Sequence, residues 1–110
     1  MKEFIESIKI GEFRIPVCNS CHARVWPPFQ FCPVCYSPTS LEKVNAIGTL
    51  VEFSVSHIKN RDGHFGVIDL DGIRIVGSLG ETPAQVGQKR KLASCGIRDD
   101  GTPFYNFERA

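Results

Sequence analysis

The sequence has no run of apolar residues close to the length of about 18 that a transmembrane helix needs, so it predicts no membrane span. It also lacks a marked excess of either charge, because its formal net charge is +1 over 110 residues. A basic patch supplies most of the affinity of nucleic-acid-binding proteins. The near-neutral composition therefore argues against nucleic acid as the partner.

Signatures of catalysis and of export are missing as well. The chain contains no nucleophile elbow, no P-loop and no dinucleotide-binding fingerprint. The carboxylates in turn-rich stretches are Asp69, Asp71, Asp99 and Asp100. Turn formation and capping account for them, so we expect no independent enzyme. Residues 1–6 carry charge where a signal peptide would be apolar, and we expect a cytoplasmic protein.

Four of the five cysteines form two C-x2-C pairs, Cys18 with Cys21 and Cys32 with Cys35. Each pair places two sulfur atoms on one tight turn, and two such turns supply a tetrahedral shell of four thiolates. This shell suits a single structural Zn²⁺, with iron in the same geometry as the alternative. Four thiolates leave no open position on the metal, so we expect no metal-centred catalysis.

The metal would also contribute to folding and change the charge. Binding zinc to four thiolates can stabilise a short chain by on the order of 10 kcal/mol. The four thiolates and one divalent ion together add −2, which lowers the net charge from +1 to −1. The fifth cysteine, Cys95, has small and apolar neighbours, which predicts a buried structural thiol.

Three segments follow one another along the chain. Residues 1–11 predict a short amphipathic helix with Phe4 and Ile8 on one apolar stripe and Gly11 at its end. Residues 12–45 form the predicted zinc ribbon, and residues 46–110 form a predicted β-barrel.

The ribbon carries aromatic side chains between its cysteine pairs, at Trp26, Phe29 and Phe31. One interpretation is that these rings pack around the metal and replace a core that the ribbon is too small to build. The other is that one or two of them face outward and anchor a partner, as Trp and Phe do at interface centres.

The pattern after residue 46 predicts strands. Residues 47–57 alternate, with apolar side chains mainly at odd positions, which predicts a half-buried strand with those positions on one face. The other predicted elements are a loop at 59–63, strands at 64–70, 73–79, 89–97 and 103–107, one capped helical turn at 82–87, and turns at 71–72 and 99–101. Three strands, a short helical element and two strands is the order of an OB-type barrel.

The chain resembles the rubredoxin-like zinc-ribbon plus OB-fold proteins that are associated with thiolases and other acyl-CoA enzymes. The residues that carry the resemblance are the two cysteine pairs, Trp26-Pro27-Pro28, the strand at 48–54, Gly87 and the segment 104–107. The resemblance implies a mainly β fold with a zinc ribbon, a small five-stranded OB-fold barrel and a short N-terminal helix. It also implies a non-catalytic accessory or scaffold subunit of a thiolase or hydroxymethylglutaryl-CoA synthase type complex, which helps to form or bridge a CoA-thioester site.

The chain departs from this family after each cysteine pair, where the family usually has glycine. Here those positions are His22 and Tyr36. Such turns often need a positive φ, which costs a non-glycine residue roughly 1–2 kcal/mol. His22 is a possible alternative ligand, but four cysteines already complete the shell.

Residues that could contact CoA or the partner are Trp26, Phe29, Lys59, Arg61 and Arg74, with His57 and His64 nearby. The cations would bind a CoA phosphate; the alternative is that they are ordinary solvated surface charge.

A single-stranded nucleic-acid-binding module is the alternative function. Its best candidate surface combines residues 89–91 with Phe104, Tyr105 and Phe107. Alternation along a strand would point Lys89 and Lys91 one way and Arg90 the other, which splits this patch.

Overall fold

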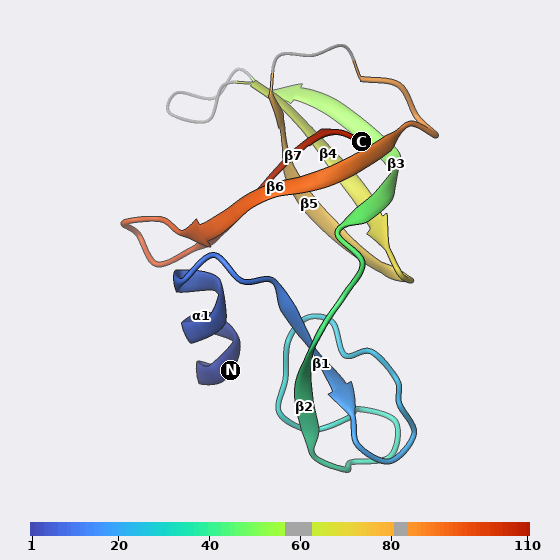
Figure 1. The fold of residues 1–110 in the computed structure, drawn as a ribbon, viewed down its shortest axis with the longest axis vertical. Coiled ribbons are helices and arrows are strands. Elements are labelled where there is room, and N and C mark those ends of the chain that lie inside the picture. The colour runs from blue at the N-terminus through green and yellow to red at the C-terminus, as the bar shows by residue number, and fades with distance from the viewer. Residues whose placement is uncertain (57–62, 81–83) are drawn as a thin grey trace.

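The computed structural model describes residues 1–56, 63–80 and 84–110. It contains helix α1 (Lys2–Lys9), a two-stranded sheet of β1 (Arg14–Cys18) and β2 (Thr39–Lys43), and a closed barrel of β3 (Ile47–Ser56), β4 (Gly63–Leu70), β5 (Ile73–Gly80), β6 (Lys89–Ile97) and β7 (Pro103–Arg109). The barrel and the two-stranded sheet lie at opposite ends of the long axis, with α1 beside their junction (Figure 1). The mainly β fold predicted from the sequence is confirmed. No helix among the described residues has the length and hydropathy needed to cross a bilayer.

The barrel closes in the order β3-β4-β5-β7-β6, and β6 pairs back onto β3 at Ile47 and Lys91. Its neighbouring strands are antiparallel, except that β5 and β7 are parallel where Ser78 meets Asn106. This order is that of a five-stranded OB barrel.

The N-terminal helix docks on the rest of the molecule through its predicted apolar stripe. Phe4 and Ile8 are buried, Ile5 is half-buried, and Gly11 follows the helix with φ 78°. An eight-residue helix is marginal alone, so packing against β1 and β6 stabilises it. Its core side chains join those of β1 and the barrel in one continuous cluster.

The predicted burial pattern of β3 is wrong in its first half. Gly48 and Leu50 are buried there, whereas Ile47 is exposed. A β-bulge between Leu50 and Glu52 then changes the phase of the strand, because Phe53 lies opposite Gly66, an inward position of β4. A bulge adds one residue to a strand, so apolar alternation in the sequence cannot locate it.

Other strand predictions are confirmed. The inward face of β5 carries buried Ile73, Ile75 and Leu79. The turn at 71–72 has positive φ at both residues, 50° and 91°, as a two-residue hairpin of the primed type requires. The last strand extends beyond its predicted end, to Arg109.

The predicted helical turn at 82–87 lies partly outside the described residues. In the described part, the Gln88 N–H donates to the Gln85 carbonyl at 3.1 Å, and Gly87 has φ 91°. This segment is a hydrogen-bonded turn and not a helix. The predicted loop at 59–63 lies outside the described residues except for Gly63, which begins β4.

Candidate metal centre

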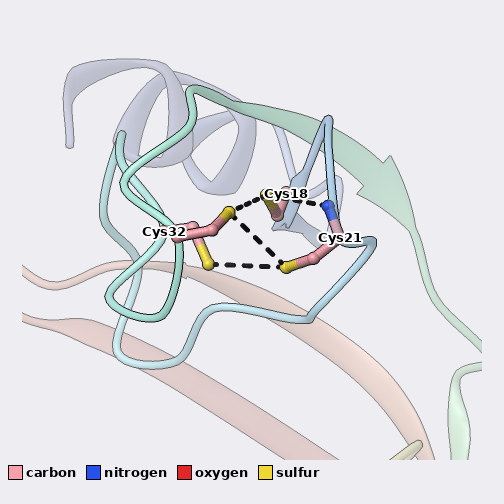
Figure 2. Close-up of side chains that lie close together, drawn as sticks. Cys18, Cys21 and Cys32 are labelled. Carbon is pink, nitrogen blue, oxygen red and sulfur yellow. Dashed lines mark hydrogen bonds between the residues drawn. The ribbon is translucent and has the colours of Figure 1, made fainter.

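Two similar turns bring the four predicted ligands together at the end of the ribbon. Cys18 ends β1, and its carbonyl accepts the N–H of His22 at 3.0 Å. The second turn repeats this arrangement, because the Cys32 carbonyl accepts the N–H of Tyr36 at 2.9 Å. Figure 2 shows the side chains of Cys18, Cys21 and Cys32 converging. One candidate ligand atom from each of the four cysteines lies within 4.8 Å of the others.

The sulfur–sulfur distances fit a tetrahedral metal site. They are 3.3 Å for Cys18 and Cys35, and 3.7 Å both for Cys21 with Cys32 and for Cys35 with Cys21. A tetrahedron with metal–sulfur bonds of about 2.3 Å has edges of about 3.8 Å. A disulfide would need a separation of about 2.05 Å, and all four cysteines are free thiols. The cysteines are therefore positioned to bind a metal ion.

Backbone amides at the turns stabilise negative charge on the sulfur atoms. The N–H groups of Ser20 and Cys21 donate to the Cys18 sulfur at 3.4 and 3.3 Å, and the Val34 N–H donates to the Cys32 sulfur at 3.4 Å. A hydrogen bond from the Ser37 backbone lowers the pKa of Cys35 to about 6. Donors of this kind favour the thiolate, which is the form that binds metal.

The close approach of the four sulfur atoms also favours binding of a cation between them. A hydrogen bond from the Ala23 backbone lowers the pKa of Cys21. Contacts with the neighbouring thiols raise this pKa by more, so that it is about 11. The sulfur atoms therefore oppose complete ionisation of the cluster. A divalent ion removes this opposition, so the donor set fits a soft, thiolate-binding metal.

The residues after the two cysteine pairs have the backbone conformation that favours glycine. His22 has φ 61° and Tyr36 has φ 63°, both in the left-handed region. Each turn is thus formed at a steric cost, because a Cβ in this region clashes with the following carbonyl oxygen.

We expect His22→Gly and Tyr36→Gly each to raise the free energy of unfolding by about 1 kcal/mol. Urea titration of the metal-loaded protein measures this change. Ser20→Gly is the matched control in the first turn, since Ser20 does not have a positive φ, and it should lower stability by about 0.5–1 kcal/mol. Glycine variants at 22 and 36 that are no more stable than the wild type would show that the backbone at these two residues is not strained.

Trp26 packs inside the molecule. Its ring lies edge-on to Phe4 at 5.6 Å, Phe13 at 6.1 Å and Tyr105 at 6.4 Å between ring centroids. These contacts connect the ribbon to the helix and the barrel. The ring is half-buried and also lines a cavity of about 380 Å³ beside α1, β5 and β7.

Phe29 and Phe31 instead face solvent. Their side chains are 55% and 44% exposed, and their rings contact each other at 6.4 Å. Trp26 therefore packs on the helix and the barrel, whereas Phe29 and Phe31 are exposed; a partner contact of these two rings stays a prediction.

The predicted cations do not form one described cluster. Arg74 is exposed on β5, across from Asp69 of β4. His64 is half-buried at the start of β4. Lys59, Arg61 and His57 lie outside the described residues.

The nucleic-acid surface suggested by the sequence is not assembled. Lys89 and Lys91 are exposed, but Arg90 is fully buried between them, and its guanidinium donates to the Gln88 side chain at 2.9 Å. Tyr105 and Phe107 are buried too, so they are not stacking platforms. The prediction of this surface is wrong, because these aromatic side chains form part of the barrel core.

Cys95 is buried, as predicted, and burial raises the pKa of its thiol. A raised pKa disfavours the thiolate, which is consistent with the structural thiol predicted from the sequence.

Sequence reasoning missed an apolar groove on the barrel. It has a volume of about 440 Å³, and Phe53, Phe65, Val67, Val76 and Val86 are among its lining residues. Val67 and Val76 are directly opposite each other on β4 and β5. The available signal was that β4 carries Phe65 and Val67 on its outward face and β5 carries Val76 on its own.

Comparison with known proteins supports the fold. Neither a family model nor a curated protein sequence matches the chain. A solved structure described as "Ltp2-ChsH2(DUF35) aldolase" is similar over 98% of this chain and 92% of its own, with a TM-score of 0.81 and 21% sequence identity. At this level of identity the likeness shows the fold alone.

Proposed function

We propose that the protein is a zinc-stabilised, non-catalytic subunit of an acyl-CoA enzyme complex of the thiolase or hydroxymethylglutaryl-CoA synthase type. The observation that carries this proposal is the position of a four-sulfur site on a five-stranded barrel, in a fold shared along almost the whole chain with a structure described as a DUF35-containing aldolase. That structure's description names two components. An accessory chain beside an enzyme subunit is the corresponding role for this protein.

Zinc is the metal that we propose for the site. The sulfur–sulfur distances of 3.7 Å are close to the edge of a zinc–thiolate tetrahedron, about 3.8 Å. Bound zinc would neutralise part of the thiolate charge and cross-link the end of β1 to the segment that leads into β2. Cys18, Cys21, Cys32 and Cys35 would hold it.

A non-catalytic role follows from the same ligand set. Four thiolates complete the tetrahedron, so neither water nor substrate can bind the ion. The protein's contribution would then be a rigid surface, since one core connects helix, ribbon and barrel. We also expect Arg74, with Lys59 and Arg61, to bind a CoA phosphate, at a place separate from the surface that contacts the enzyme subunit.

Affinity purification from the native host tests this function. We expect a thiolase-like or other acyl-CoA enzyme subunit to be recovered in fixed stoichiometry, identified by mass spectrometry. A Cys18→Ser, Cys32→Ser variant is the control and should recover less, because its ribbon cannot hold zinc. Recovery of the bare protein under gentle conditions would contradict the proposal.

A further inference from the structure

The second cysteine turn presents an unusually apolar surface. Its exposed apolar side chains are Phe29, Phe31, Val34 and Tyr36, with exposed fractions of 55%, 44%, 75% and 79%. We call these four residues the knuckle face. Large apolar side chains that are exposed together within one short segment mark an interaction site more often than a free surface.

The segment that carries the knuckle face has no charged side chains, although it binds a negatively charged metal centre. Residues 25–41 contain no Asp, Glu, Lys, Arg or His. A centre of four thiolates and one divalent ion carries −2, and two of its ligands, Cys21 and Cys35, are exposed. Two cations outside this segment have acidic partners: Arg24 lies 3.6 Å from Asp71, and Arg14 lies 2.9 Å from Glu12. The segment that carries the knuckle face therefore also carries two ligands of a negative centre, Cys32 and Cys35, and supplies no counter-charge to it.

Charge complementarity defines the partner chemistry. The negative centre repels a polyanion, so the exposed rings are not placed to stack on nucleic acid. It attracts a cation, and Arg among aromatic neighbours is typical of the centre of a protein interface. The barrel groove lacks such a defining feature, and nothing in the structure shows what covers it.

We propose that the knuckle face is the surface that docks on the enzyme subunit, and that it receives an apolar protein face with an Arg or Lys side chain over the exposed edge of the four-thiolate centre. This inference rests on the proposed function and specifies the partner-binding surface. The aromatic side chains supply apolar contact area, and the metal centre orients the basic residue.

Covalent-labelling mass spectrometry of the zinc-loaded full chain tests the location. The comparison is between the free protein and its complex with the subunit that co-purifies from the host. We expect labelling of Phe29, Phe31 and Tyr36 to be lost in the complex, while labelling of Val76 and Val86 persists. Protection confined to the barrel groove would overturn this inference and leave the proposed function intact. Failure to recover any subunit would contradict both.

Matched double variants test the energetics. Phe29→Ser with Phe31→Ser should weaken binding of the same subunit at least about 30-fold, as expected for interface anchors. Val76→Ser with Val86→Ser, on the barrel, should change it less than about threefold. Zinc content and melting temperature of each variant establish that it is folded. Equal weakening by both pairs would contradict docking through the knuckle face.

A third variant tests the charge. Cys35→His retains a zinc-binding ligand set but lowers the charge of the centre from −2 to −1. We expect weaker binding of the subunit and a shallower dependence of its dissociation constant on salt concentration. Unchanged affinity and salt dependence would show that the subunit places no basic residue over the metal centre. Binding of a single-stranded oligonucleotide that Phe29→Ser with Phe31→Ser abolishes, while binding of the subunit is unchanged by that variant, would overturn the choice of a protein partner.

Discussion

Removal of the metal is expected to unfold the ribbon and to abolish the cooperative stability of the chain. A four-thiolate zinc site can contribute on the order of 10 kcal/mol to folding, which is comparable to the whole stability of a small domain. The ribbon has little else to hold it, because its two-stranded sheet consists of five-residue strands. Its buried side chains also belong to the core shared with the barrel, so loss of the ribbon exposes Ile15 and destabilises the packing of α1.

Circular dichroism during titration with a zinc chelator measures this effect. Cys32→Ser should reproduce it without chelator, since Cys32, like Cys18, is a fully buried ligand. Cys95→Ser is the matched control: it removes a buried thiol that lies outside the cluster and should leave zinc binding unchanged. A chelated protein that keeps its spectrum and melting temperature would show that the metal is not structural.

Leu50→Ala is expected to lower the free energy of unfolding by about 3–5 kcal/mol. Leu50 is fully buried, lies opposite fully buried Ile68, and would contact any side chain added at Gly66. Truncation leaves a cavity at the centre of the barrel that its neighbours fill only in part. Urea titration of the zinc-loaded protein gives the value.

Phe53→Ala is the matched comparison on the same strand. Phe53 is 47% exposed, so its truncation should cost about 1 kcal/mol or less. The original alternation pattern implies the reverse order, with the odd positions buried. A larger loss at Phe53 than at Leu50 would contradict the burial that the structure gives these two side chains.

The elements that local patterns specify were the ones predicted from the sequence. Turn chemistry located the hairpin at 71–72, and alternation located the inward face of β5. The four cysteines were found by spacing alone, because two sulfurs on each tight turn are a local feature. The left-handed backbone at His22 and Tyr36 is also local to these turns, although neither residue type indicates it.

Features that depend on tertiary packing could not be predicted in the same way. A bulge changes the phase of β3, and only the pairing with β4 reveals it. Trp26 and Phe29 belong to one aromatic segment, yet one ring packs on Phe4 and Tyr105 while the other is exposed. That difference depends on where α1 and the barrel lie, and the segment itself carries no information about either.

Zinc-edge X-ray absorption spectroscopy on protein purified from its native host tests the metal centre most directly. We predict one zinc ion per chain with four sulfur ligands at about 2.3 Å and no nitrogen or oxygen ligand. A shell that includes nitrogen or oxygen donors would contradict a closed thiolate site and the passive role that follows from it, and absence of zinc would contradict zinc as the metal.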